Sequence, residues 1–349
     1  MDAYNTECPA ACLIDGVEGH GARTVDLGKS CDETRAMKQW PNSLIGTKNG
    51  SRESSKQVRQ PRRMLTLSLA GGEPPRMGRK VNELCDASGS VLARAFSSEN
   101  MRWIEWPGLG VFAFSGGSHE VCVWQERNAS QEAVADTFSR IIKPIILQAL
   151  GWQALHAGAA AGPAGVLAFC GRSGSGKSTL AFAMHRAGWR QFADDALVLW
   201  LDQNRVSAVA LPFAPRLRPP SRAQFARVGR SPLLSLRKAQ SVDAPLSAVF
   251  LLEQNARLTN VRVSLIPKAR AFSELLTHAH CFDVEDRAHN RRLVNDYLEL
   301  VTRVPVFLLE YRPDFRQLPR LIHAVMEAVP GIDADAVFSS ELRPTALLA

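Results

Sequence analysis

A glycine-rich stretch near the middle of the 349-residue chain constrains its fold more than any other feature. Residues 171–178 read Gly-Arg-Ser-Gly-Ser-Gly-Lys-Ser and match the pattern Gly-x-x-x-x-Gly-Lys-[Ser/Thr]. An unbroken apolar run precedes the stretch at 166–170, and a helical pattern follows at 177–187, with Gly188 where a C-terminal cap belongs. A buried strand, a glycine-rich turn and a helix in this order predict a phosphate-binding loop within an α/β domain.

The residue types of this loop explain how it would hold a phosphate. Glycines reach left-handed backbone angles, so successive N–H groups can converge on an anion at a helix N-terminus. We expect Lys177 to reach the β- and γ-phosphates of ATP and Ser178 to ligate Mg²⁺ through its hydroxyl. The predicted cofactor-binding residues are Gly171, Arg172, Ser173, Gly174, Ser175, Gly176, Lys177, Ser178 and Thr179.

Two adjacent carboxylates, Asp194 and Asp195, follow the loop after one helix and a short turn. They fall within residues 191–200, which read as a single strand. Beside a nucleotide, one carboxylate can hold Mg²⁺ and the other can accept the proton of an attacking hydroxyl. Because neighbouring strand residues point to opposite faces, we expect the two to differ in role. An acidic turn without function is the alternative.

Three further side chains are candidates from their positions. His156 lies at the end of the first strand of a predicted hairpin, 152–170, where a lone histidine is more often structural than functional. Arg216 and Arg218 follow the Asp pair in a segment whose four prolines predict a loop at 211–222. Their guanidinium groups could meet a transferring phosphoryl group or an acidic acceptor. A solvated surface loop is the alternative.

Composition and hydrophobic periodicity along the chain predict its domain organisation. Residues 1–62 are polar with little periodicity, which indicates a poorly ordered leader or an overcalled start. Residues 63–131 carry short alternating or apolar runs between turn residues, typical of a small β-rich unit; the runs are 65–70, 91–96, 101–106, 110–114 and 120–124. Residues 132–335 carry longer helical and strand patterns and form the expected phosphate-loop domain, with Lys143-Pro144 dividing its first helix and a tail at 336–349.

The net charge of +8 is concentrated in two segments. Residues 51–80 hold eight Lys and Arg against two Glu, and residues 201–240 hold eight against one Asp. Neither segment interleaves aromatic residues with its arginines, and no zinc-finger or RNA-recognition signature accompanies them. Nucleic acid is therefore not an expected partner.

The cysteines and the hydropathy pattern bear on location. Seven scattered cysteines without a Cys-x-x-Cys pair indicate free thiols in a reducing compartment rather than a zinc site. No apolar stretch is long enough to span a bilayer, and the N-terminus lacks the pattern of a signal peptide. We expect a cytoplasmic protein without a membrane partner.

The segment 155–200 resembles the catalytic core of the HPr serine kinase/phosphorylase family. Leu155-His156, the short hairpin, the phosphate loop, Gly188 and Ala193-Asp194-Asp195 carry the resemblance, in the family's order. It implies a P-loop kinase core of the phosphoenolpyruvate-carboxykinase-like type, ATP and Mg²⁺ as cofactors, and transfer to a protein serine. It also implies that His156 lies near the transferred phosphate, that Asp194 is the general base and that Asp195 lies on the Mg²⁺ side.

Two departures from the family argue against HPr itself as the acceptor. Thr179 stands where the family has Glu, and the later segment Glu-Ile-Arg-Gly-Leu-Gly is absent. Some HPr-kinase-like relatives are similar to tailoring kinases that phosphorylate a serine of a ribosomal peptide precursor. The predicted function is thus an ATP-dependent Ser/Thr kinase acting on a protein or ribosomal peptide, with Lys177, Asp194, His156 and Arg218 as catalytic residues.

Two other functions stay open. The chain could phosphorylate a small metabolite, or it could bind ATP as a non-catalytic regulatory protein. Guanine specificity and transporter-ATPase activity are not supported, because the motifs Asn-Lys-x-Asp and Leu-Ser-Gly-Gly-Gln are absent. The sequence also leaves open the reverse, phosphorylase reaction and the oligomeric state, a homo-oligomer included.

Overall fold

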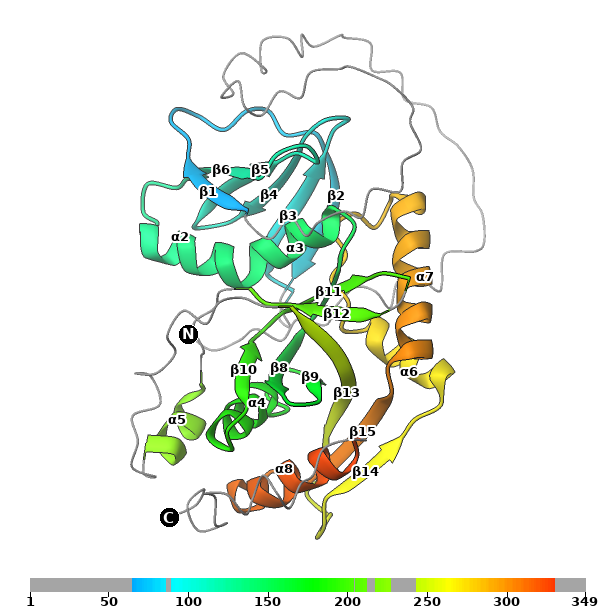
Figure 1. Cartoon of the computed structure of the whole chain (residues 1–349). Coiled ribbons are helices and arrows are strands. Elements are labelled where there is room, and N and C mark those ends of the chain that lie inside the picture. The colour runs from blue at the N-terminus through cyan, green and yellow to red at the C-terminus, as the bar shows by residue number, and fades with distance from the viewer. Residues whose placement is uncertain (1–64, 86–88, 204, 212–216, 227–242, 330–349) are drawn as a thin grey trace.

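The computed structural model describes residues 65–85, 89–203, 205–211, 217–226 and 243–329. These residues form a mixed α/β protein with two sheets, a six-stranded sheet at the top of Figure 1 and a nine-stranded sheet below it. The predicted leader 1–62, the tail 336–349 and Arg216 lie outside the described residues. In the part that is described, no helix combines the length and apolar character needed to cross a membrane.

The N-terminal sheet has six strands in the order β1-β6-β5-β4-β3-β2. Its neighbours are antiparallel except for β1, which runs parallel to β6. The runs predicted from alternating hydropathy form five of these strands, whereas β2 was missed because its charged and polar residues hide the alternation. The bounds are β1 (Thr66–Leu69), β2 (Arg79–Cys85), β3 (Val91–Ser97), β4 (Arg102–Trp106), β5 (Gly110–Phe114) and β6 (Glu120–Gln125).

One long helix packs on this sheet in three pieces, α2 (Gln131–Thr137), the π-helical turn η3 (Phe138–Ile142) and α3 (Lys143–Ala149). The predicted division at Lys143-Pro144 is confirmed, since the hydrogen-bond pattern changes at Lys143. A proline cannot donate to the preceding turn, and a widened π turn accommodates the loss. Phe138 of η3 joins the helix to the sheet, because its ring stacks on that of Phe112 in β5 with ring centroids 6.3 Å apart.

The second sheet has nine strands, with the path β10-β8-β9-β13-β12-β11-β7 and with β15 between β13 and β14. Its central strands β9, β13 and β15 are parallel. The bounds are β7 (Gln153–Leu155), β8 (Ala157–Gly162), β9 (Gly165–Cys170), β10 (Arg190–Ala193), β11 (Leu197–Leu201), β12 (Val206–Val209), β13 (Ala244–Gln254), β14 (Arg262–Leu265) and β15 (Val306–Tyr311).

The predicted hairpin into β9 is present, and Gly162 pairs with Gly165 across its turn. Its first strand is interrupted at His156: β7 pairs with β11, whereas β8 pairs with β9 and β10. The single strand expected at 191–200 is wrong, because the chain leaves β10 at Ala193 and enters β11 only at Leu197. Asp194 and Asp195 therefore lie in a connection between two strands.

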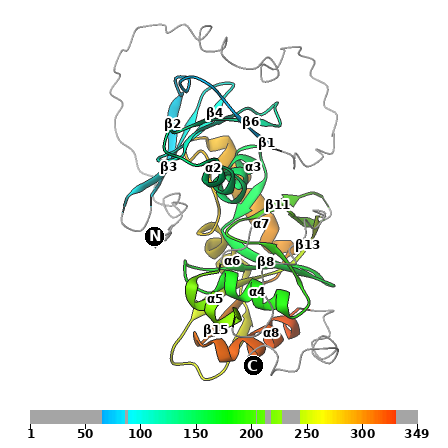
Figure 2. The same ribbon diagram turned by 90° about the vertical axis from the view of Figure 1, so that its left-hand side faces the viewer.

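Helices cover both faces of the nine-stranded sheet (Figure 2). The core on one face is formed with α4 and α8, and the core on the other face with α6 and α7. Part of the predicted proline loop is also helical, because Pro219 and Pro220 begin α5, where proline needs no N–H partner. The bounds are α4 (Lys177–Arg186), α5 (Pro219–Ala226), α6 (Lys268–Leu276), α7 (Arg287–Arg303) and α8 (Leu318–Glu327), with the 3-10 turn η4 (Phe315–Gln317) before α8.

The connection between α6 and α7 ties the two sheets together. Phe282, 2% exposed, enters the core beneath the six-stranded sheet and lies edge-on to Phe114, with ring centroids 5.5 Å apart. Its N–H donates to the side-chain oxygen of Gln148 at 2.8 Å, and the carbonyl of Cys281 accepts a hydrogen bond from Asn82 at 2.7 Å. Apolar burial and hydrogen bonds thus hold the same connection.

Replacing Phe282 by alanine should remove this tie. We expect Phe282→Ala to lower the free energy of unfolding by about 3–5 kcal/mol, because it leaves a cavity in a well-packed core. Urea unfolding followed by circular dichroism measures the loss. Leu265→Ala is the control, since Leu265 is 65% exposed and should change stability little. Equal stability of the two variants would contradict a core role for Phe282.

Candidate functional site

The phosphate loop joins the end of β9 to the start of α4, as the sequence predicts. Gly174 and Gly176 have φ angles of +84° and +96°, a left-handed region that L-side chains rarely adopt. Gly176 is also crowded, because a Cβ atom there would lie 2.6 Å from the hydroxyl of Tyr311. Both glycines are therefore required by the path of the backbone.

The ends of two neighbouring parallel strands hold the loop from behind. Tyr311, the last residue of β15, donates its hydroxyl to the carbonyl of Ser175. Gln254, the last residue of β13 and the register partner of Tyr311, donates its side-chain N–H to the carbonyl of Gly174 at 3.2 Å. Burial raises the pKa of Tyr311, so the phenol stays protonated and remains a donor.

Lys177 is buried at the first position of α4. Its Nζ donates to the carbonyl oxygens of Gly171 at 2.7 Å and Arg172 at 3.1 Å. Burial lowers the pKa of Lys177, while the negative charges of Asp195 and Asp194 oppose that shift. The ammonium group is thus fixed against the loop and within electrostatic reach of both carboxylates.

Arg218 reaches the loop from the segment that begins α5. Its Nη2 donates to the hydroxyl of Ser173 at 2.9 Å, and Thr179 and Ser221 share a hydrogen bond of 2.8 Å between α4 and α5. The structure therefore brings Arg218 to the glycine loop. Thr179 instead joins the two helices.

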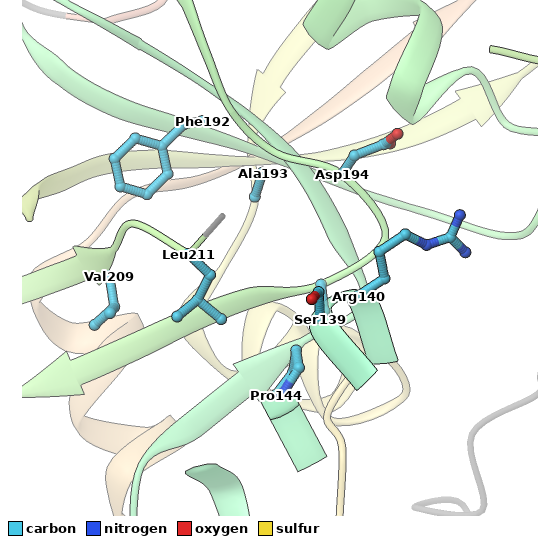
Figure 3. Close-up of a pocket in the computed structure, with 9 residues that line it drawn as sticks. Ser139, Arg140, Pro144, Phe192, Ala193, Asp194, Val209 and Leu211 are labelled. Carbon is cyan, nitrogen blue, oxygen red and sulfur yellow. The ribbon is translucent and has the colours of Figure 1, made fainter. Parts of the chain in front are cut away.

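The two carboxylates occupy different surroundings, although they lie in a turn rather than on a strand. Asp194 is 4% exposed and lines a small pocket together with Ser139 and Arg140 (Figure 3). The Asp195 side chain is 37% exposed, and its Oδ2 lies 3.1 Å from Nη2 of Arg140. Asp195 takes φ +69° in this turn, and the two residues differ in exposure and in partners.

His156 lies at the break between β7 and β8 and has two histidine neighbours that the sequence reasoning missed. The backbone N–H of His156 donates to the backbone carbonyl of His278 at 2.7 Å, and the His156 ring lies edge-on to that of His280, with centroids 6.5 Å apart. Burial, followed by the charge of Lys177, lowers the pKa of His156 well below its usual value. The available signal was the pair His278-x-His280 directly after a helical pattern.

The same causes keep the two neighbours neutral. Burial lowers the pKa of His280 to about 4, and burial with the charge of Lys177 lowers the pKa of His278 to about 4. All three histidines are therefore uncharged at neutral pH and add no positive charge behind the phosphate loop.

Ser178 and Asp195, the predicted Mg²⁺ ligands, supply hydroxyl and carboxylate oxygens, which suit a hard cation. Ser178 lies in the first turn of α4, beside the loop. No cluster of three or more His, Cys, Asp or Glu side chains among the described residues could hold a metal by itself. This donor set fits Mg²⁺ that is held by one or two side chains together with phosphate oxygens.

Comparisons with known proteins give a distant likeness of fold. No family model matches the chain, and no curated protein matches it. Among solved structures, the HPr(Ser) kinase/phosphatase from Coxiella burnetii is similar over 54% of this chain and 99% of its own, with 15% sequence identity and a TM-score of 0.31. A likeness at this level assigns neither activity nor substrate.

The contact between Gly176 and Tyr311 gives a test of the loop geometry. Gly176→Ala should be more destabilising than Gly188→Ala, because both residues have positive φ but a Cβ at Gly188 would meet nothing within 4 Å. The backbone cost alone is about 1–2 kcal/mol. In a Tyr311→Phe background, which removes the obstructing oxygen, the excess cost of Gly176→Ala should shrink. Chemical unfolding of the wild type and of these four variants measures this, and an excess that is absent or unchanged would contradict the geometry.

The neutral histidines predict a pH dependence of stability. Their pKa values are lower in the folded chain than in the unfolded chain, so the unfolded chain binds more protons, and stability falls as pH drops from about 6.5 toward 4. When the pH is lowered from 7 to 5.5, His278 and His280 should each reduce the free energy of unfolding by about 1 kcal/mol. Urea unfolding at both pH values measures the loss.

His278→Asn and His280→Asn should each reduce that difference in unfolding free energy between pH 7 and 5.5. His323→Asn, on the surface of α8, is the matched control and should leave it unchanged. A wild-type chain that is equally stable at both pH values would show that the buried histidines do not govern acid sensitivity.

Proposed function

We propose that the protein is an ATP-dependent kinase that transfers the γ-phosphate to a serine or threonine hydroxyl of a protein or peptide. One observation carries the proposal: β8 lies between the glycine loop and the Asp turn, since a Cβ at Gly158 would lie 3.3 Å from the carbonyl oxygen of Lys177, and the next residue, Ala159, pairs with Ala193 before the turn. A triphosphate on the loop would therefore lie beside two carboxylates. Phosphoryl transfer to a hydroxyl needs such groups, one to hold Mg²⁺ and one to accept the proton of the hydroxyl.

The finer assignments belong to the same proposal. The sequence motifs support an HPr-kinase-like enzyme with a core of the phosphoenolpyruvate-carboxykinase-like type, working in the cytoplasm. Its partner would be a protein or peptide rather than nucleic acid or membrane. HPr is not the favoured acceptor, since Thr179 stands in place of the family's Glu and instead bonds to Ser221.

Each residue has a distinct task in the proposed reaction. Backbone N–H groups of the loop would bind the phosphates, while Lys177 and Arg218 would neutralise their charge. Ser178 and Asp195 would hold Mg²⁺, which supplies charge neutralisation at the β- and γ-phosphates. His156, kept neutral by burial, would lie near the transferred group without adding charge.

Asp194 would act as the general base. As the acceptor oxygen forms its bond to the γ-phosphorus, the bond from that phosphorus to the β–γ bridging oxygen breaks. ADP leaves with the electron pair, and the proton of the acceptor hydroxyl passes to Asp194. Its place beside the small pocket supports this role, because a base needs access to the acceptor.

Two variants test the function. Lys177→Ala should weaken Mg-ATP binding, whereas Asp194→Asn should bind Mg-ATP but lose about 100-fold or more of phosphoryl transfer, the usual contribution of general-base catalysis. Calorimetry measures binding, and mass spectrometry of lysates incubated with labelled ATP identifies the phosphorylated peptide or metabolite. Lys268→Ala is the control for loss of a lysine and should match the wild type, since Lys268 is exposed at the start of α6.

The outcomes separate the three functions. A phosphorylated peptide serine or threonine supports the proposal, and a phosphorylated metabolite would favour the small-molecule kinase. Mg-ATP binding without transfer to any lysate component, in the wild type as in Asp194→Asn, would favour the non-catalytic nucleotide-binding protein.

A further inference from the structure

A buried arginine outside the phosphate loop lies against the Asp194-Asp195 turn. Arg140 belongs to η3, the π-helical turn between α2 and α3, and its side chain is 10% exposed. Its Nη2 contacts the carboxylate of Asp195 at 3.1 Å. The helix that carries Arg140 packs on the six-stranded sheet and lies between the two sheets, so this charge reaches the Asp turn from the side of the six-stranded sheet (Figure 1).

Much of the hydrogen-bonding capacity of this guanidinium is unused. Its Nε and Nη1 atoms are buried without a hydrogen-bond partner in the part of the chain that the structure describes. The Oδ2 atom of Asp136 is 3.9 Å from Nε, which is beyond hydrogen-bond distance. Unmet donors on a buried cation are costly, and the fork of an arginine matches paired phosphate oxygens. Arg140 is thus suited to a second anionic partner.

The pocket beside Arg140 gives that partner a location. Ser139, Arg140 and Asp194 line it on one side, and Phe192, Val209 and Leu211 line it on the other (Figure 3). On the first side, the guanidinium of Arg140 and the carboxylate proposed as the general base both extend away from these apolar side chains (Figure 3). A phosphoryl group accepted next to Asp194 would come within reach of Arg140.

Asp195 can exchange Arg140 for another cation. Asp195 is the one non-glycine residue with a positive φ in the described chain, and its side chain is 37% exposed. The carboxylate is the partly exposed member of the pair and can turn to another cation, whereas the buried guanidinium then needs a new anionic partner. In the proposed function that cation is Mg²⁺, and its binding would release Nη2 of Arg140.

We propose that Arg140 is a further catalytic residue, which leaves Asp195 and binds the phosphoryl group in transfer. The inference rests on the proposed kinase function. As the acceptor oxygen bonds to phosphorus and ADP departs, charge spreads over the three equatorial oxygens, and the guanidinium would bind two of them. The six-stranded sheet would thereby serve catalysis, because its helix positions Arg140.

The test compares Mg-ADP affinity with and without fluoroaluminate, which mimics the planar phosphoryl group. Isothermal titration calorimetry on the full wild-type chain should show at least about tenfold tighter binding with fluoroaluminate. Arg140→Gln should lose this gain while its Mg-ADP affinity stays within about twofold of the wild type. Arg94→Gln is the matched control, because Arg94 also bridges two carboxylates, Glu83 and Glu105, but on the six-stranded sheet.

The results separate this inference from the proposed function. Two results would overturn the role of Arg140 and leave the kinase proposal standing. In the first, Arg140→Gln gains as much Mg-ADP affinity with fluoroaluminate as the wild type does. In the second, the wild type binds Mg-ADP but gains no affinity with fluoroaluminate. A wild-type chain that binds no Mg-ADP would overturn the kinase proposal and this inference with it. If Arg140→Gln does not fold, Arg140→Lys decides: it keeps the charge without the fork, so it should lose most of the gain, and full tightening would overturn the inference.

Discussion

The buried ammonium of Lys177 is the constraint around which the candidate site is organised. A lysine can remain charged in a protein interior only where polar groups surround it. Here the carbonyls of Gly171 and Arg172 accept its hydrogen bonds, and the carboxylates of the Asp turn oppose the effect of burial. The loop that supplies those carbonyls needs left-handed glycines and is fastened by the ends of β13 and β15.

Burial is the main reason that the histidines behind the loop are neutral, and the charge of Lys177 adds to it for His156 and His278. Three imidazolium groups close to a buried ammonium would repel it and one another, and burial already favours their uncharged forms. The site thus has a positive side, formed by Lys177 and Arg218 at the loop, and an uncharged back wall. This distribution favours an anion that enters from the loop side.

Local patterns in the sequence predicted the elements that depend on local physics. The apolar run of β9, the glycine loop, the hairpin turn and Gly188 after α4 all have specific backbone requirements, and all are present. The change of helix type at Lys143 also follows from one residue, Pro144, which comes next in the sequence. The strand expected at 191–200 was wrong because its apolar residues continue on both sides of the Asp pair and conceal a turn.

The rest of the site depends on contacts between distant segments. Arg140, His278 and His280 carry no motif, and only the folded sheets bring them to the residues around the loop. Arg218 could be proposed from its nearness in sequence, whereas the Tyr311 hydroxyl behind Gly176 could not. Sequence patterns located the phosphate loop, and tertiary packing supplies the side chains that surround it.

The tie between Asn82 and the carbonyl of Cys281 has a consequence for the order of folding. These residues are 199 positions apart, so the six-stranded sheet leaves the ribosome long before its lower core can close. The contacts of Asn82 with Cys281 and of His156 with His278 can therefore form only after residues 278–281 have been synthesised.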